Sequence, residues 1–282
     1  LIKTEKSPFR GSEIVRLAHT SRNISPMFVG EDSAFADAGA QGYSRMFVDQ
    51  RKLMSRLRMT WEVMQDSTSN EGAFISARKS EMQYLIDDMA RRDEFALNSD
   101  GRGVLALVDE SPSGTTLDVD APGGVTNDNF GNRFISAGMF IGAVNPQTGK
   151  LRTTIHKVSS VAAAGNSIVV GSATHTGWEN NDYIVQAANS AASDILDTSY
   201  EHAWWGLMAL VDDGTYRASY FGLDRTTVPA YSSYVTASTG ALSTDLIQRV
   251  SDVVDQKLNG KISNIICHHS TRRLVVKLTD AD

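Results

Sequence analysis

The amino-acid sequence predicts an α+β protein with an extended hairpin, one long helix and an inserted small β-barrel or sandwich. Three observations predict this class. Residues 43 to 63 nearly alternate between apolar and charged side chains, which is the period of a strand. Residues 71 to 97 repeat apolar side chains at helical spacing. Between residues 104 and 190, short apolar runs are separated by turn residues, which is typical of a small barrel or sandwich.

The composition limits the size and class of the protein. At 282 residues the chain is long enough for about two domains, or for one domain with a large insertion. No apolar run approaches the roughly 20 residues of a membrane-spanning helix. A net charge of -6 argues against a dedicated nucleic-acid binder, because counterion release requires a basic face. Cys267 is the only cysteine, so an intrachain disulfide and a cysteine-based zinc site are excluded.

The first 66 residues are not expected to form a domain with its own core. Residues 1 to 25 are polar and weakly periodic, and residues 26 to 42 are rich in glycine, alanine and aspartate. Such a segment buries too little apolar surface to offset its ordering entropy. The strand at 43 to 63 is expected to pair with Met27 to Phe35 in an extended hairpin. A two-stranded hairpin is marginal in water, so this one needs a partner surface.

Five basic residues cluster on the predicted hairpin: Arg45, Arg51, Lys52, Arg56 and Arg58. Two interpretations remain open for them. Charged side chains on an exposed strand discourage aggregation. The same side chains could instead contact acidic surfaces of neighbouring subunits.

The helix predicted from about Glu71 to Leu97 has clear signals at both ends. Ser67, Thr68, Ser69 and Asn70 are suitable N-cap residues. Asn98 to Gly101 then end the helix with residues that accept left-handed backbone conformations.

The last third of the chain predicts a helix, a strand and a second helix. Ser243 can cap a helix whose apolar positions run from Leu246 to Leu258. Ile262 to His268 is a candidate for a buried strand, and Ser270 can start a short helix.

No group of residues predicts catalysis, a metal site or a cofactor. Cys267, His268 and His269 are adjacent, but consecutive strand residues point to opposite faces. The run Asn98 to Gly103 follows a helix, whereas phosphate-binding glycines precede one. We therefore expect a protein that is not an enzyme.

The remaining polar candidates are expected to be structural. His156, His175 and His202 fall in unrelated β or loop contexts, and no Gly-x-Ser-x-Gly motif marks a hydrolase serine. Neighbouring carboxylates, such as those at 87 and 88 or at 212 and 213, are normally solvated.

The order of these parts resembles the major capsid proteins of tailed bacteriophages with the Hong Kong 97 fold. Three stretches carry the resemblance. The first runs from Tyr43 to Glu62 and leads into the capped helix, and the second is the helix end from Ala90 to Gly101. The third comprises Gly206 to Gly214, Gly222 to Arg225, and the helix from Thr244 with the strand that follows it.

The resemblance implies five parts. They are an N-terminal arm at 1–25, an E-loop hairpin at 26–60, a peripheral domain with the spine helix at 61–103, an inserted β-rich domain at 104–190 and an axial domain at 191–282. The inserted domain is larger than the minimal fold requires. The family returns to its peripheral domain at the C-terminus, so on this resemblance its last strands would be missing from the chain.

The resemblance also implies a function. Such a protein is a structural subunit of the virion that self-assembles into hexamers and pentamers of an icosahedral or prolate capsid around double-stranded DNA. Its partners would be other copies of itself, decoration, portal and scaffolding proteins, and DNA without sequence specificity, with no membrane contact and no cofactor. The five basic hairpin residues would then be intersubunit contacts.

Alternatives from other classes remain. A β-rich surface-binding protein or phage tail component would use the insertion to hold a carbohydrate or protein partner. A weaker alternative is a hydrolase that uses His202 or His268.

Overall fold

The fold was obtained as a computed structural model. It describes residues 11–31, 34–58, 71–110, 112, 114–125, 130–163, 165–171, 175, 177–236, 242–258, 262, 264–267 and 269–279. The chain divides into two compact units, Leu1–Ser232 and Ser233–Asp282.

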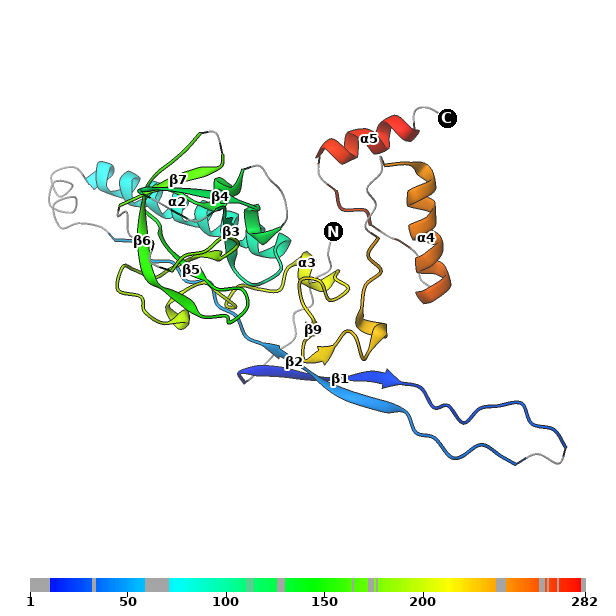
Figure 1. Cartoon of the computed structure of the whole chain (residues 1–282). Helices are drawn as coiled ribbons and strands as arrows, with labels where there is room; N and C mark the ends of the chain where they lie inside the picture. Colours follow the sequence, from blue (N-terminus) through cyan, green and yellow to red (C-terminus); the bar gives the residue numbers. More distant parts are fainter. Residues whose placement is uncertain are drawn as a thin grey trace. The chain divides into compact units, whose positions relative to one another are not determined.

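The first unit contains a closed barrel of six antiparallel strands (Figure 1). The strands are β3 (Val104–Val108), β4 (Thr116–Asp120), β5 (Phe140–Val144), β6 (Leu151–Val161), β7 (Ser167–Val170) and β8 (Tyr183–Gln186). They follow one another around the barrel in the order β3-β4-β7-β6-β5-β8. Closure gives every strand two neighbours, so the barrel has no open edge.

Alternation along the strands builds the core of the barrel. In β4, Leu117 and Val119 are buried, whereas Thr116 and Asp118 are exposed. β3 and β5 are buried along nearly their whole length. The buried apolar side chains of the strands and of two connecting segments form a single cluster: Leu105, Ala106, Val108, Leu117, Val119, Ile135, Ile141, Ala143, Val158, Ile168, Val170, Trp178 and Ile184. The larger apolar side chains of the described residues are therefore buried mainly here.

The predicted fold class is wrong. The chain is β-rich and is organised around the closed barrel, not around a spine helix in a Hong Kong 97-like α+β fold. A helix, α2, does cover Glu71–Asn98. Of its side chains that the structure describes, Ala96 alone is buried, and the apolar Met82 and Ile86 are exposed. Helical periodicity indicates where a helix forms, but not whether a core forms along it.

The C-terminal end of α2 packs closely against the chain after the barrel. Gly101 and Gly103, which follow the helix, have φ angles of 81° and 74°, as expected for residues that end a helix. A Cβ atom on Gly206 would lie 2.3 Å from the carbonyl oxygen of Ala96 and 2.4 Å from that of Ser99. Glycine at 206 therefore allows this approach.

A second, smaller sheet forms a hairpin that we call the arm (residues 13–49). β1 (Glu13–Ser21) pairs antiparallel with β2 (Gly42–Asp49). Beyond the ladder the two segments continue without regular pairing towards a turn (Figure 1). They remain close, because a Cβ on Gly39 would lie 2.3 Å from Oδ1 of Asn23. We call residues 22–41 the tip of the arm.

The predicted pairing within the hairpin is wrong. β2 pairs with Glu13–Ser21 and not with Met27 to Phe35. The sequence predicts instead that Glu13–Ser21 belongs to a separate N-terminal segment, residues 1–25. The strand also ends at Asp49, and the described residues 50–58 that follow contain no strand. The alternation of β1 is weak because apolar residues are adjacent at 14–15 and at 17–18, and three polar residues follow at 19–21. The end of the predicted strand at 59–63 and the N-cap residues 67–70 lie outside the described residues.

Short elements after the barrel hold the base of the arm. They comprise α3 (Leu207–Leu210), β9 (Ser219–Tyr220) and β10 (Leu223–Asp224), and the last two form a two-stranded sheet. The backbone N–H of Phe47 in β2 donates to the carbonyl oxygen of Phe221, at an N–O distance of 3.0 Å. The ring of Phe221 stacks on Trp205 with centroids 4.3 Å apart.

The second unit contains two helices, α4 (Thr244–Leu258) and α5 (His269–Thr279). The hydroxyl of Ser243 accepts a hydrogen bond from the backbone N–H of Leu246, as predicted for its N-cap. The buried strand predicted at 262–268 is wrong for the residues described there, which have no strand and are exposed. No described residue of this unit reaches full burial. Across the described parts of both units, no helix is long and apolar enough to cross a membrane.

Candidate assembly surfaces

The ladder of the arm has one face on which apolar side chains are exposed. In its register Val15 lies opposite Phe47, Leu17 opposite Arg45, and His19 opposite Tyr43. Of these, Leu17 is 73% exposed. On the other face, Ile14 and Val48 are opposite each other and half-buried. The first face therefore presents apolar side chains that the arm itself does not cover.

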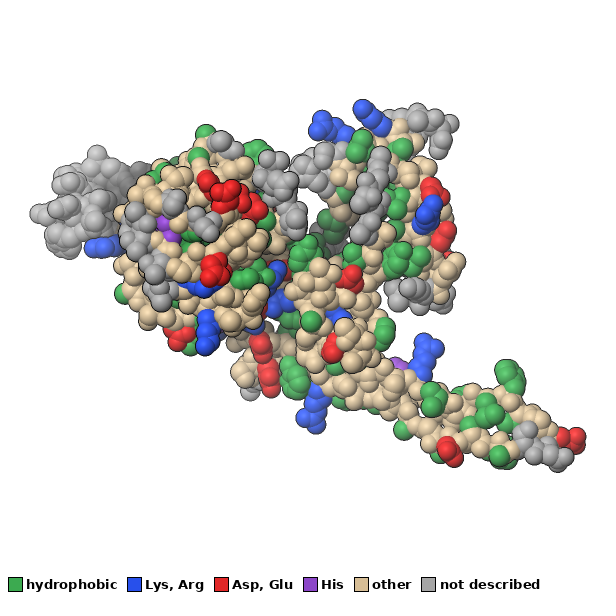
Figure 2. Space-filling view, in the orientation of Figure 1, with side chains coloured by type: hydrophobic (Ala, Val, Ile, Leu, Met, Phe, Trp, Pro, Cys, Tyr) green, Lys and Arg blue, Asp and Glu red, His purple; other side chains and the backbone are tan. Residues whose placement is uncertain are grey.

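The tip of the arm is more exposed than the ladder. Ile24 is 90% exposed, Phe35 is 87% exposed, and Phe28 is fully exposed. Met27 and Val29 are exposed as well. Figure 2 shows this apolar surface as separate green groups along the arm, with acidic side chains at its end. Such a concentration of large apolar groups on a few residues marks an interaction surface or a site prone to aggregation.

The five basic residues predicted on the hairpin take different positions. Arg45 is exposed on β2, and Lys52, Arg56 and Arg58 are exposed in the segment after it. Arg51 is held instead: its guanidinium donates to the carbonyl oxygen of Glu201 and lies 3.7 Å from the carboxylate of Asp49. Four of the five are therefore exposed for contact, and Arg51 fixes the base of the arm.

A groove of about 870 Å³ lies between α2 and the barrel, and the segment after β2 also lines it. Met54, Met89, Met139 and Met208 all contribute to its lining. Methionine side chains are flexible and polarisable, so they adapt to irregular apolar partners. Leu53, Met54 and Ser55 line the groove, so the exposed Lys52 and Arg56 flank it in the sequence.

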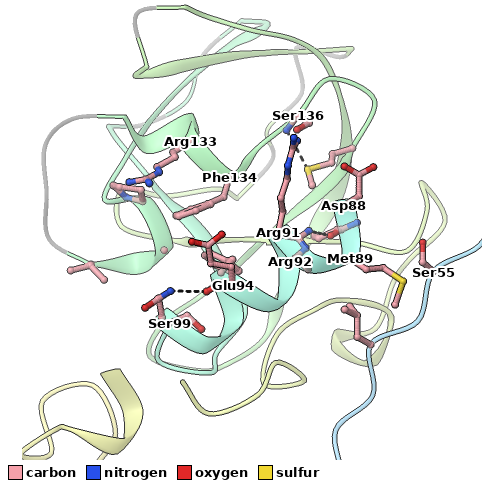
Figure 3. Close-up of a pocket in the computed structure, with 18 of the residues that line it drawn as sticks. Ser55, Asp88, Met89, Arg91, Arg92, Glu94, Ser99, Arg133, Phe134 and Ser136 are labelled. Carbon is pink, nitrogen blue, oxygen red and sulfur yellow. Dashed lines mark hydrogen bonds between the residues drawn. The ribbon is translucent and has the colours of Figure 1, made fainter. Parts of the chain in front are cut away.

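Two aromatic rings and three arginines complete the chemistry of the groove. Phe95 of α2 packs against Phe134, which lies in the segment between β4 and β5, with ring centroids 4.4 Å apart. In Figure 3, Arg91, Arg92 and Asp88 lie on the helix, while Arg133, Phe134 and Ser136 come from the barrel side. The lining of the groove thus mixes apolar side chains with charged and polar side chains from both elements.

Arg92 is the most enclosed cation of this groove. Its guanidinium donates to the side-chain oxygen of Gln186 and lies 5.8 Å from the ring centroid of Phe95. Burial lowers the pKa of Arg92 from its ordinary value. Among the residues that the structure describes, no carboxylate forms an ion pair with Arg91, Arg92 or Arg133. A partly desolvated cation of this kind favours an acidic ligand.

The adjacent residues Cys267, His268 and His269 do not form a site in the described structure. Cys267 is free and exposed, and it lies in a segment without a strand. His268 lies outside the described residues, and His269 begins α5. In the described part of the chain, no three histidine, cysteine or acidic side chains gather as metal ligands.

Two histidines that appear unrelated in the sequence meet inside the barrel. The rings of His156 and His175 are buried, with centroids 4.7 Å apart. The ring of Trp178 lies 5.2 Å from that of His156. Nε2 of His175 is 2.8 Å from the carbonyl oxygen of Gly114. His202 is exposed and lies outside this cluster, so the prediction that the three occupy unrelated places is wrong for His156 and His175.

The prediction that Asp212 is solvated is also wrong. Its side chain is only 2% exposed, and it lies 4.0 Å from the guanidinium of Arg225, which is also buried. The carboxylate accepts hydrogen bonds from the backbone N–H groups of Tyr216 and Arg217. The neighbouring Asp213 is exposed, as are Asp87 and Asp88. Of the two neighbouring pairs, Asp87 with Asp88 and Asp212 with Asp213, only Asp212 is buried and hydrogen-bonded within the fold.

Sequence reasoning identified the basic residues but missed the groove beside them. Its lining comes from segments between residues 53 and 208 that are far apart in the sequence. Four of the 9 methionines line it, and the sequence carries no signal that brings them together. Comparison of the chain with protein-family models, curated proteins and solved structures finds no match.

Proposed function

We propose that this chain is the major capsid protein of a tailed bacteriophage. In this function it is a structural subunit that joins copies of itself into hexamers and pentamers of an icosahedral or prolate shell around double-stranded DNA. The single observation that carries the proposal is the arm, with its large exposed apolar side chains.

Burial of the arm supplies the driving force for assembly. Each large apolar side chain contributes about 1.5–3 kcal/mol when it moves from water into an apolar contact. Ile24, Phe28 and Phe35 are at least 87% exposed in one copy, so nearly all of this free energy is available to an intermolecular contact. Part of it offsets the loss of motion on association and the ordering of the arm. The ladder itself is only marginally stable alone, so its order is coupled to assembly.

The form of the contact favours closed rings. An arm that docks on a different surface of its neighbour makes a head-to-tail contact, and such contacts generate rings when the rotation closes. Hexamers and pentamers are rings of this kind. The exposed Arg45, Lys52, Arg56 and Arg58 would add contacts with acidic surfaces of neighbouring subunits.

The proposal does not depend on the Hong Kong 97-like fold, which the barrel architecture contradicts. It depends on the exposed apolar arm and on charge. A net charge of -6 disfavours strong electrostatic binding to packaged DNA, so contact with DNA is expected only at local basic side chains and without sequence specificity. Decoration, portal and scaffolding proteins would be its further partners in the virion, and no catalytic step is assigned to it.

Electron microscopy and size-exclusion chromatography of the full chain test this proposal. We expect ring-shaped capsomers or closed particles at micromolar concentration. The double variant Phe28→Ser, Phe35→Ser should elute as a monomer, because it removes two apolar groups from the tip without touching the barrel core. Its far-ultraviolet circular dichroism and its thermal transition should match those of the unmodified chain.

A chain that stays monomeric at every concentration and salt condition tried would overturn the capsid function. Glycan or protein binding by that monomer would then support the surface-binding or tail-protein alternative. Particles formed equally well by the double variant would show that the tip does not drive assembly.

A further inference from the structure

One face of the helix α5 carries three cations and a single valine. Arg272 and Val276 are four residues apart, as are Arg273 and Lys277, so all four lie on one side of the helix. All four side chains are exposed. They line a hollow of about 560 Å³, so three positive charges converge on one place. We call these four residues the cationic face of α5.

The charges of this face are not neutralised within the part of the chain that the structure describes. No carboxylate there forms an ion pair with Arg272, Arg273 or Lys277. The preceding helix α4 differs, because Arg249 is paired with Asp245 at an N–O distance of 2.7 Å. From residue 261 to residue 279 the sequence contains no acidic residue. Although the net charge of the chain is -6, α5 therefore concentrates uncompensated positive charge.

The opposite face of α5 is partly covered. Thr271, Val275 and Leu278 recur at helical spacing and are half-buried. A helix that lies in a membrane surface needs its apolar face free to enter the lipid. In α5 the cationic face is the free one, so its exposed chemistry matches an anionic partner in water.

Double-stranded DNA fits the spacing of these cations. Residues 272 to 277 extend over about 7.5 Å of helix axis, at about 1.5 Å per residue. Over that length DNA carries about four phosphate charges, one per roughly 1.7 Å of its axis. Arginine guanidiniums match phosphate oxygens through paired N–H groups. Three cations on one face can therefore contact successive phosphates without reading the bases.

We infer that the cationic face of α5 is the site at which this chain contacts DNA, through phosphates and without sequence specificity. This inference rests on the proposed function and names the side chains that meet the packaged DNA. In a shell, α5 then faces the interior. Counterions released from the phosphates supply the favourable free energy, so binding weakens as the salt concentration rises. A single copy binds weakly, and many copies in one shell add their contacts along one DNA.

The test measures binding of the full chain to a short fluorescent double-stranded DNA by anisotropy. The chain carries Phe28→Ser and Phe35→Ser, and its monomer fraction from size-exclusion chromatography is used, so that assembly does not enclose α5. Three phosphate contacts predict that log K falls with log salt concentration at a slope of about -2.7 between about 50 and 200 mM salt. The variant Arg272→Gln, Arg273→Gln, Lys277→Gln should bind at least tenfold more weakly at the lower salt concentration, with a slope near zero. Arg273→Gln alone should reduce the slope by about one.

Arg45→Gln, Lys52→Gln, Arg56→Gln is the matched control, because it removes three exposed cations of the first unit and changes the net charge equally. It should leave the affinity and the slope unchanged. Arg249→Gln is the control within the second unit, since Arg249 is already paired with Asp245. Unchanged far-ultraviolet circular dichroism of all variants would exclude unfolding as the cause of lost binding.

Anionic vesicles and polyglutamate test for a different partner of the same face. Leu274 beside it is 50% exposed, so vesicles of phosphatidylserine and phosphatidylcholine are the competing surface. Vesicles that bind the chain more tightly than DNA does would overturn the assignment to DNA. Polyglutamate that displaces DNA at an equal concentration of charge would overturn it as well, in favour of an acidic protein.

Absence of DNA binding at both salt concentrations, or equal losses in the α5 variant and its matched control, would also overturn the inference. Particle formation by the unmodified chain is read separately by electron microscopy. If particles form but the α5 variant binds DNA as before, the capsid function stands and the contact with DNA lies elsewhere. If α5 binds DNA as predicted and the unmodified chain never self-associates, the capsid function fails while α5 remains a surface that binds DNA.

Discussion

The barrel and the arm are both built from antiparallel strands, yet they bury their apolar side chains very differently. Each barrel strand has two neighbours, and Leu117 and Ile141 inside it are completely buried. In the described sheets, β1 and β2 have only each other as ladder partners, and Leu17 stays 73% exposed. Because its sheet is closed, the barrel buries its apolar side chains without contact with another surface. The arm can bury its apolar side chains only against another surface.

Loss of core volume in the barrel should have the largest effect on stability. Leu117→Ala removes a completely buried side chain, and such substitutions cost about 2–5 kcal/mol. Urea unfolding followed by tryptophan fluorescence measures the loss. Leu17→Ala on β1 makes the same chemical change at an exposed position and should cost less than about 0.5 kcal/mol. Equal costs at the two positions would remove the contrast between barrel and arm.

Backbone packing in the barrel should give the next largest effect. A Cβ atom on Gly131 would lie 2.3 Å from the carbonyl oxygen of Val119 and 2.6 Å from Cα of Asp120. Because these are backbone atoms, Gly131→Ala should cost about 1–3 kcal/mol of unfolding free energy. At Gly171 the nearest atom would be 3.7 Å away, so Gly171→Ala is the control and should be nearly neutral. A Gly131→Ala variant with unchanged stability would mean that the backbone at Val119 and Asp120 moves away from the added methyl group at little cost.

Removal of a like-charge pair at the base of the ladder should change stability less than the two barrel substitutions, and it should stabilise the arm. Glu13 lies directly opposite Asp49, and like charges in such pairs are destabilising. Arg51, 3.7 Å from Asp49, offsets part of the repulsion. Glu13→Lys should stabilise the ladder by about 0.2–1 kcal/mol, measured as slower amide hydrogen exchange in β1. Glu31→Lys in the tip is the control. Unchanged exchange in β1 would show that the pair does not limit the order of the arm.

The smallest effect is expected at the tip in dilute solution. Ile24 is 90% exposed, so Ile24→Ser should change the unfolding free energy by no more than about 0.5 kcal/mol. The measurement is urea unfolding at a concentration below that of self-association. A cost above about 1 kcal/mol would mean that the tip packs on its own chain, which would end the distinction between the two regions.

The sequence predicted local elements better than their partners. The cap and periodicity around Ser243 and Leu246 predicted α4, because these signals lie within a few residues of one another. The partner of β2 was predicted wrongly, since Glu13–Ser21 alternates weakly and pairing is a long-range choice. The fold class failed for the same reason: the apolar positions of α2 predicted a helix, but not that Met82 and Ile86 would remain exposed.

The candidate site shows the same limit. Arg45, Lys52, Arg56 and Arg58 were recognisable as a cluster because they lie within one short segment. The groove was not recognisable, because closure of the barrel and the end of α2 bring Met89, Met139 and Met208 to one place. Burial of Asp212 beside Arg225 depended equally on tertiary structure.

The turn between β5 and β6 has a practical consequence for engineering. Asn145 organises it locally: its side-chain oxygen accepts from the backbone N–H groups of Gln147 and Thr148, and its carbonyl oxygen from that of Gly149. Both strands keep their other ladder partners whatever the turn contains. Each doubling of a flexible loop costs only about 0.6 kcal/mol of closure entropy. A foreign peptide inserted at 147 would therefore be displayed at little thermodynamic cost, while an insertion of equal length in the arm tip would alter the segment that we propose as the contact between copies.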